Sequence, residues 1–311
     1  MKYTSINFLV LLCGLLVACS TASGATPVVI ENAGFEDPVL GDGAFVDGIP
    51  GWSEYNGGWP GVWNVEAGEY ALEAPEGSNV GWLWESGAGS GANQVLSGAT
   101  GLFELDADYS MDFFVGYANS YANPGYQIQL LAGGTVLAED DNSMTLTQGA
   151  FSTGNFSYTY NAAHSALVGQ PLEVRLLTKD LGIGDRELEL DIIAVNATYA
   201  HPVPFAGDNA YHVIIDTGSL SLDATGSLPS DGSTITNYDW DFNGDGSYEL
   251  TGVQPAEISY ADLTGTYGLS DGANTVNLRV TDAAAETTIR AWDINLAPAA
   301  TTYTGTNSKT D

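Results

Sequence analysis

Apolar and polar residues alternate along much of the chain. Every second position from 109 to 117 is aromatic or aliphatic: Tyr109, Met111, Phe113, Val115 and Tyr117. Residues two apart on a strand point to the same face of a sheet, so the pattern predicts a half-buried β-strand. The segments 126–130 and 172–176 alternate in the same way. Helical periodicity is nearly absent, and the fold class we predict is all-β.

Turn-forming residues separate the predicted strands. Gly133 and Gly134 lie between two strand-like runs. Both central positions of a tight hairpin turn favour positive φ, which glycine adopts without steric cost, so this pair predicts a β-hairpin. Several short strands with turns of this kind predict a jelly-roll β-sandwich over residues 27–199.

Pro202, Pro204 and Gly207 interrupt the strand pattern. Such residues are typical of a linker, which we place at residues 200–209. A second set of strand-like segments follows and predicts a smaller, immunoglobulin-like β-sandwich over residues 210–297. The small and polar residues of the tail, 298–311, are expected to be disordered.

The N-terminus has the features of an export signal. A short apolar run follows Lys2, and it is too short to be a permanent membrane span. The motif L-V-A-C, which ends at Cys19, fits a bacterial lipobox, in which the Cys19 thiol receives a lipid after cleavage. Cleavage after Ala25 is the alternative. We therefore treat residues 1–25 as signal peptide and tether, and expect an outer-membrane or cell-surface lipoprotein, or otherwise a secreted protein.

Negative charge dominates the composition, with 39 Asp and Glu against 7 Lys and Arg and a net charge of −32. Phosphate backbones and anionic lipids would be repelled. Nucleic acid is therefore not expected as a partner, and membrane contact is expected only through a lipid anchor. Cys13 and Cys19 are the only cysteines, and Cys13 leaves with the signal, so no intramolecular disulfide can form. Excess acid suits divalent cations, a saline exterior or solubility alone.

One acidic stretch, residues 31–52, opens the predicted first sandwich. Its oxygen-bearing side chains lie among glycines and prolines that force turns: Asn32, Glu36, Asp37, Asp42 and Asp47. Carboxylate and amide oxygens on tight turns suit a hard cation such as calcium, which takes about six to eight oxygen ligands. A solvated acidic loop is the alternative.

The motifs N-A-G-F-E-D-P at 32–38 and P-G-W at 50–52 resemble the opening of a bacterial family of calcium-binding β-sandwich domains related to carbohydrate-binding modules. The segments 126–138 and 190–195 resemble the central hairpin and last strand of that family. Its best-known enzymatic members are the calcium-dependent cyclases of hapalindole-type alkaloid biosynthesis. The resemblance spans about residues 27–199, and it is more specific for the fold than for any activity.

The resemblance also implies where calcium would bind. In related sandwiches the first and last strands lie side by side, so an acid of the opening motif meets an acid of the last strand. Carried to this chain, that pairs Glu36 with Asp191, with Asn32 and Asn79 as further ligands and the metal in a structural role. The related cyclases work with a buried acid in an aromatic pocket, but the sequence assigns no residue of this chain to that catalytic position.

The predicted second sandwich resembles a PKD domain, a module that usually spaces or presents other domains. The likeness rests on S-L-D-A-T-G-S at 221–227, Y-D-W-D-F-N-G-D-G at 238–246 and V-T-D at 280–282. Such domains are not catalytic, so we expect any activity to lie in the first sandwich.

A second calcium hypothesis comes from the same segment. Asp241, Asn243 and Asp245 occupy positions 1, 3 and 5 of an EF-hand-like loop. Position 12 is Gly252 instead of glutamate, which removes the bidentate ligand. Glu249 is a substitute that would reach the ion by a different path, and a plain turn is the alternative.

Five of the seven tryptophans fall between positions 52 and 84. Exposed aromatic rings stack on sugars in carbohydrate-binding modules, and we select Tyr55, Trp59 and Trp63 as candidate ligand contacts. Trp59 follows two glycines and precedes a proline, which favours a projecting loop. Trp52 is expected in the core.

The function that these features favour is noncatalytic binding of a glycan or another cell-surface polymer. One alternative is a cyclase-like enzyme on the same calcium-binding sandwich, and another is a purely structural envelope protein. The sequence contains no nucleophile-elbow, metalloprotease or P-loop motif. An open cleft at Trp59 and Trp63 would favour the glycan, whereas a closed apolar pocket with a buried carboxylate would favour an enzyme.

Overall fold

The computed structural model describes residues 24–84, 87–179, 186–207, 211–214, 218–252 and 256–297. Residues 1–23 of the predicted signal and tether, which include Cys19, and the predicted tail lie outside the described residues. Within the described ranges, no helix is long and apolar enough to cross a membrane. Strands form nearly all of the regular structure, which confirms the all-β fold class.

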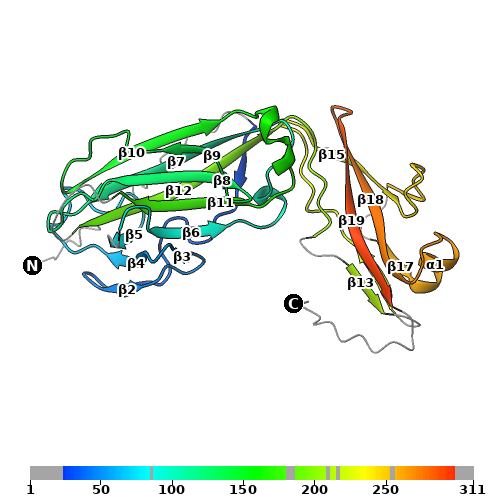
Figure 1. Ribbon diagram of the computed structural model, residues 1–311, viewed down its shortest axis with the longest axis horizontal. Helices are drawn as coiled ribbons and strands as arrows, with labels where there is room; N and C mark the ends of the chain where they lie inside the picture. The colour runs from blue at the N-terminus through cyan, green and yellow to red at the C-terminus, as the bar shows by residue number, and fades with distance from the viewer. Residues whose placement is uncertain are drawn as a thin grey trace, which may run out of the picture.

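Two antiparallel sheets form an N-terminal β-sandwich (Figure 1). The larger sheet contains β1 (Thr26–Val28), β2 (Phe45–Asp47), β4 (Trp59–Asn64), β5 (Asn79–Trp84), β7 (Ala107–Tyr117), β10 (Ala150–Tyr158) and β12 (Glu187–Tyr199). Their order is β10-β7-β12-β5-β4-β2, with β1 paired to β12. The smaller sheet, in the order β3-β6-β11-β8-β9, contains β3 (Ser53–Tyr55), β6 (Gly91–Val95), β8 (Tyr126–Ala132), β9 (Thr135–Asp140) and β11 (Leu172–Thr178). Two short 3-10 helices, η1 (Ala99–Gly101) and η2 (Ala162–Leu167), lie in the connections.

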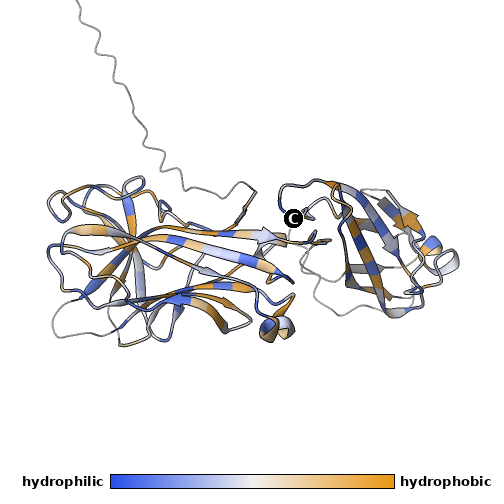
Figure 2. Ribbon diagram, turned by 90° about the horizontal axis from the view of Figure 1, so that it is seen from above, coloured by the Kyte–Doolittle hydropathy of each residue, from blue (hydrophilic) through white to orange (hydrophobic). Residues whose placement is uncertain are grey.

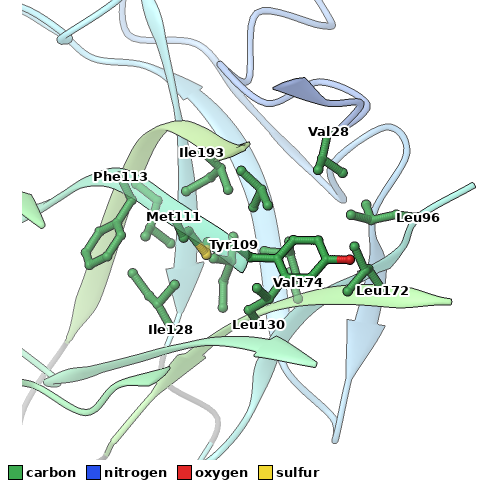
Figure 3. Packing of buried hydrophobic residues seen from close by; sticks show 14 of the residues in the cluster. Val28, Leu96, Tyr109, Met111, Phe113, Ile128, Leu130, Leu172, Val174 and Ile193 are labelled. Atoms are coloured by element: carbon green, nitrogen blue, oxygen red, sulfur yellow. The ribbon is translucent and has the colours of Figure 1, made fainter. Parts of the chain in front are cut away.

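The core lies between these two sheets and uses the predicted alternation. Figure 3 shows Tyr109, Met111 and Phe113 of β7 facing Ile128 and Leu130 of β8. All five are essentially buried. Each such side chain contributes about 1.5–3 kcal/mol of transfer free energy, so this layer is a main source of stability.

The predicted hairpin at Gly133 and Gly134 is confirmed. These residues join β8 to β9 and have φ values of 51° and 78°. Positive φ at both central positions gives the turn a twist that matches the flanking strands.

A second pair of sheets follows. The larger, in the order β13-β19-β18-β15-β16, contains β13 (Tyr211–Ile214), β15 (Ile235–Asp241), β16 (Leu250–Thr251), β18 (Gly272–Asp282) and β19 (Thr287–Ala297). The smaller pairs β14 (Ser219–Leu222) with β17 (Ala256–Ser259), and helix α1 (Tyr260–Gly265) follows β17. Apolar and polar positions alternate along β18 and β19 (Figure 2), and their buried residues pack around Trp240. The resemblance of this unit to PKD domains stays a prediction.

The segment between the two units is packed against both of them. Val203 exchanges two backbone hydrogen bonds with Leu228, of 2.8 and 3.0 Å, and both side chains join the core of the first sandwich. Arg290 of β19 forms an ion pair with buried Glu104 of the first sandwich. The residues predicted to be a linker therefore make defined contacts with the units they join.

The outer face of the larger sheet, which points away from the core, is also covered. Residues 65–78, called here the covering loop, lie over it. Tyr70 of this loop packs with Trp63, Val80 and Trp82 in an apolar cluster separate from the main core. Strands β4, β5 and β12 are therefore buried on both faces at this point, which explains their long runs of large side chains.

Candidate active site

A cavity of about 360 Å³ opens on the outer face of the larger sheet. Aromatic side chains make most of its wall: Phe45, Trp59, Trp63, Trp82, Trp84 and Tyr121. Gly43 and the carboxyl groups of Asp47, Glu66 and Glu187 complete the lining. The combination is a large apolar surface with a few polar groups, which is typical of small-molecule sites.

Strand register places these residues on one face. Trp59 of β4 lies opposite Trp84 of β5, and Trp84 lies opposite Glu187 of β12. In the neighbouring row, Gly61 lies opposite Trp82, which lies opposite Glu189. Residues opposite each other in antiparallel strands point to the same side, so both rows contribute to one wall.

Gly61 gives Trp82 the space that it occupies. A Cβ atom at position 61 would lie 2.3 Å from Cε2 of Trp82 and 2.2 Å from the backbone oxygen of Val46. The indole ring of Trp82 therefore lies across β4, where a side chain would otherwise stand. Its buried N–H has no hydrogen-bond partner in the part of the chain that the structure describes.

Glu187 is the polar group at the inner end of the cavity. Only 6% of its surface is exposed. Burial raises the pKa of Glu187 to about 7, against an ordinary value near 4.5. A carboxyl group with this pKa is partly protonated at neutral pH and can both donate and accept a proton.

Glu189 lies two residues further along the same face and is fully buried. Burial, together with repulsion from Glu187, raises the pKa of Glu189 well above its ordinary value. Oε2 of Glu189 accepts a 2.7 Å hydrogen bond from the Tyr70 hydroxyl, and Oε1 has no partner among the described residues. Burial therefore favours the neutral form of Glu189, which lies beneath the covering loop.

The covering loop is fixed from several sides. The ring of Tyr70 stacks on Phe151 with centroids 4.5 Å apart. The backbone N–H of Ala71 donates to Gly149, and Oε2 of Glu69 accepts a 2.9 Å hydrogen bond from the N–H of Ser120. These contacts keep Tyr70 over the buried carboxyl group of Glu189.

The structure brings together two of the three predicted ligand contacts. Trp59 and Trp63 both line the cavity. Trp59 is 52% exposed, and its indole N–H donates a 3.0 Å hydrogen bond to Oδ1 of Asp47. It begins strand β4 instead of projecting from a loop, because the preceding Asn56 and Gly57 already complete the turn. Tyr55 lies apart, on β3 of the other sheet, with the Arg175 guanidinium 4.1 Å above its ring.

The sequence analysis missed Glu187 and Glu189, and it did not assign Trp82 and Trp84 to the site. The signal was available in the run E-L-E-L-D at 187–191, where acids and leucines alternate. That pattern is ordinarily the sign of one solvated strand face. Here the covering loop buries that face, and alternation alone contains no information about a loop more than 100 residues away.

A second group of carboxylates lies at the opening stretch. Strand β1 pairs with β12, as the resemblance implied for the first and last strands. Asp191 is buried, and burial, with repulsion from Glu76 and Glu36, raises its pKa to about 8. Oε1 of Glu36 accepts 2.9 Å hydrogen bonds from the N–H groups of Ser78 and Asn79. The predicted pair Glu36 and Asp191 thus shares one acidic region, to which the sequence analysis had not added Glu76.

Two further observations fit a cation in this region. Oδ1 of buried Asn79 has no hydrogen-bond partner among the described residues, while its amide nitrogen donates to the backbone oxygens of Phe35 and Pro38. A Cβ on Gly34 would lie 2.8 Å from Oε2 of Glu76 and 4.0 Å from Oδ1 of Asp191. These oxygen atoms have no cationic side chain as a partner among the described residues, and together they form a donor set suited to calcium.

Asn32, which the resemblance implied as a further ligand, closes the turn of the opening motif. Its amide nitrogen donates to the backbone oxygen of Asp37, and its Oδ1 accepts from the Asp37 N–H. Both polar atoms are used to close the turn. The turn docks on a β-bulge in β12, where Ile192 has a φ of 47° and the N–H of Ile193 donates to Ala33.

The loop at 241–249 forms a tighter cluster. Carboxylate oxygens of Asp241, Asp245 and Glu249 lie within 4.8 Å of one another. Glu249, suggested above as a substitute for the ligand missing at Gly252, is part of this cluster. The oxygens also accept hydrogen bonds from the loop itself, including those from Phe242 to Glu249 and from Asn243 to Glu249. Calcium at Asp241, Asn243 and Asp245 remains a prediction.

Several solved protein structures resemble the first sandwich. The Stig cyclase FisC from Fischerella sp. TAU, in complex with (3Z)-3-(1-methyl-2-pyrrolidinylidene)-3H-indole, is 28% identical with a TM-score of 0.51, over 56% of this chain and 98% of that chain. A cyclase from the same organism in complex with 4-(1H-indol-3-yl)butan-2-one gives the same values. The CBM22-1 xylan-binding domain of Paenibacillus barcinonensis Xyn10C is 16% identical with a TM-score of 0.37, over 57% of this chain and 97% of that chain. That last likeness is too weak to inform function.

No curated protein sequence matches the chain. The profile of the HpiC1-like family, described as HpiC1 cyclase, matches residues 26–196, which is more than half of the 311 residues. That match covers the sandwich, the aromatic cavity and the buried carboxyl groups described above. The chain belongs to the HpiC1-like cyclase family.

Proposed function

We propose that the first sandwich is a cyclase that closes a ring in a small aromatic substrate by general acid catalysis, with Glu187 as the acid. The observation that carries this proposal is the buried carboxyl group of Glu187 in a cavity walled by aromatic rings. The buried carboxyl group and the aromatic wall fit the enzyme alternative, whereas the opening beside Trp59 and Trp63 fits the glycan-binding hypothesis. The cyclase family of the chain supports the enzyme. The main interpretation of the sequence, a noncatalytic glycan-binding module, is therefore less well supported than its cyclase alternative.

The substrate class follows from the cavity. About 360 Å³ between Trp59, Trp63 and Trp82 suits a fused aromatic ring stacked on the indole faces. The neighbouring cyclase structures contain indole compounds, which supports an indole-bearing substrate here.

The chemical step needs only one proton. Glu187 donates it to the substrate and creates an electron-poor carbon atom. A π-electron pair from elsewhere in the same molecule forms the new bond to that carbon. The cation that results then loses a proton to the Glu187 carboxylate, so the net reaction is an isomerisation that requires no oxidant or reductant. The faces of Trp63, Trp82 and Trp84 stabilise the cation while the bond forms.

Glu189 and Tyr70 act as positioning residues in this scheme. Glu189 lies beneath the covering loop, where it accepts the hydrogen bond from Tyr70. Burial raises the pKa of Glu187 and a hydrogen bond with Glu189 lowers it, so the position of Glu189 limits how far that pKa rises.

Calcium would have a structural role. Glu36, Glu76 and Asp191, with Oδ1 of Asn79, are the residues that would hold it. Its positive charge would neutralise the acids that join the opening stretch to β12. Asp191 lies two residues from Glu189 on the same strand face. A calcium ion that fixes Asp191 would therefore also help to fix Glu189.

The test uses hydrogen exchange and needs no knowledge of the natural substrate. The protein is incubated in D₂O with 4-(1H-indol-3-yl)butan-2-one, and NMR follows deuterium incorporation at the indole C2 position, which requires protonation of the ring. We expect wild-type protein to accelerate exchange, and Glu187→Gln to lower the acceleration by about 10²–10⁴-fold. Glu54→Gln, at an exposed position on β3, is the control. Equal acceleration by wild type and Glu187→Gln would refute the proposal.

Glycan binding keeps one observation in its favour, the exposed ring of Trp59 beside Asp47. A glycan array with wild type and Trp59→Ala tests it. Saturable binding that is lost in Trp59→Ala, without any hydrogen exchange on the indole ketone, would favour this second function.

A further inference from the structure

Every charged group among the described residues that line the cavity is negative: the carboxyl groups of Asp47, Glu66 and Glu187. Acidic residues outnumber basic ones 39 to 7 in the whole chain, so an excess of acid here follows in part from the composition. Each carboxylate nevertheless favours hydration over a neutral apolar ligand, so this lining suits a ligand of opposite charge.

The lining falls into an outer and an inner zone. At the mouth, Phe45, Asp47, Trp59 and Glu66 are all exposed. At the inner end, Trp63, Trp82 and Glu187 are buried. The mouth therefore combines two carboxylates with two aromatic rings, while the inner zone combines aromatic rings with a single carboxyl group.

The carboxylates at the mouth have no cationic partner in the described part of the chain. Among the described residues, no ion pair includes Asp47 or Glu66. The hydrogen bond from Trp59 uses only Oδ1 of Asp47 and holds the indole ring beside the carboxylate. An aromatic face next to an unpaired carboxylate is the arrangement that binds ammonium groups in proteins.

The dimensions of the sheet separate the two zones. Strand β2, which carries Asp47, is three strands away from β12, which carries Glu187. With strands about 4.8 Å apart, their backbones are roughly 14 Å from each other. One molecule could therefore place a charged group at the mouth and a ring in the inner zone, without bringing its charge onto Glu187.

We propose that the cavity selects an organic cation: a substrate with an aliphatic ammonium group, held at the mouth by Asp47, Glu66 and Trp59, and with its aromatic ring in the inner zone. This inference rests on the proposed function, because it assumes that the aromatic cavity is the substrate site. The negative net charge of the chain would also raise the local concentration of such a cation and speed its encounter with the site.

Two ligands of the same shape test the charge. Tryptamine and tryptophol share the indole ring and a two-carbon side chain, but only tryptamine carries an ammonium group at neutral pH. Calorimetric titration should give at least about tenfold tighter binding of tryptamine at low salt. Because exposed charges are screened, the preference should shrink when sodium chloride is raised.

Variants of the residues at the mouth test whether their carboxylates cause the preference for tryptamine. Asp47→Asn together with Glu66→Gln should bring the affinity ratio of tryptamine to tryptophol close to one, since asparagine can still accept the Trp59 hydrogen bond. The control, Glu54→Gln, removes an exposed charge outside the cavity and should leave the ratio unchanged. A preference that persists in the double variant would overturn the assignment to these carboxylates.

The two proposals fail in different ways. If tryptophol and the indole ketone bind and the ketone exchanges deuterium, but tryptamine binds no better than tryptophol, only the cation proposal is refuted. If no indole compound binds and the ketone does not exchange, the substrate site itself is refuted, and the cation proposal is refuted with it.

Discussion

Tyr70 donates a 2.7 Å hydrogen bond to Glu189 across 119 residues of sequence, and this contact fixes the covering loop over a buried carboxyl group. The loop covers part of the outer face of the larger sheet, beside the cavity. Burial raises the pKa of Glu187 to about 7 and, together with repulsion from Glu187, raises the pKa of Glu189 well above its ordinary value. The proposed chemistry therefore depends on a contact between a loop and the last strand of the sandwich.

Tyr70→Phe tests that contact. The change removes one donor from a fully buried carboxyl group, which should cost about 1–3 kcal/mol of unfolding free energy. Because the loop then holds Glu189 less firmly, deuterium exchange on the indole ketone should slow by about tenfold, while the affinity for the ketone stays close to that of wild type. Thermal unfolding, calorimetry and NMR measure the three quantities. Tyr55→Phe, on the other sheet, is the matched control, and an equal loss in both variants would argue against a specific role for Tyr70.

Glu187 should give the folded protein a pH-dependent stability. Its pKa is raised to about 7 in the folded state, against about 4.3 in an unfolded chain. Between these values the folded state binds a proton that the unfolded state releases, so stability falls as pH rises through this window. We expect the Tm of Glu187→Gln to fall less between about pH 5 and pH 7.5 than that of wild type. Parallel Tm curves would show that Glu187 is ionised in the folded protein throughout.

Calcium should stabilise the protein through Glu36 and Asp191. An ion at about a thousand times its dissociation constant adds about 4 kcal/mol to the unfolding free energy if the unfolded chain does not bind it. We expect Glu36→Gln and Asp191→Asn to lose most of that gain in scanning calorimetry with calcium or chelator. The same measurement on Asp245→Asn tests whether the loop at 241–249 also binds calcium. Identical midpoints for wild type in calcium and in chelator would mean that the acids at the opening stretch bind no structural ion.

Gly61→Ala tests the construction of the cavity. The added methyl group would meet the Val46 backbone and the Trp82 ring at about 2.2 and 2.3 Å, so the strand or the ring must move. We expect a stability loss of about 1–3 kcal/mol and a weaker affinity for the indole ketone. A methyl group added at Gly41 would meet no atom of the described residues within 4 Å, which makes Gly41→Ala a suitable control. Unchanged ketone affinity in Gly61→Ala would place the ligand away from Trp82.

The alternation of apolar and polar residues was sufficient to predict the strands but not to predict the site. Alternation at Tyr109, Met111 and Phe113 predicted a core strand correctly, and positive φ at Gly133 and Gly134 followed from the hairpin rule. These features depend on neighbours in sequence. The burial of Glu187 depends on the covering loop, and the separation of Tyr55 from Trp59 depends on which sheet each strand joins. Neither can be read from periodicity, because both are set by contacts between distant segments.

The pH dependence of deuterium exchange on the indole ketone is the sharpest test of Glu187 as the acid. If Glu187 donates the proton, the wild-type rate should be highest below about pH 7 and fall tenfold per pH unit above it, once the carboxyl group has lost its proton. Glu187→Gln should show only the slow exchange of the ketone in buffer, at every pH. A Glu187→Gln variant that exchanges at the wild-type rate, with the same dependence on pH, would contradict this assignment.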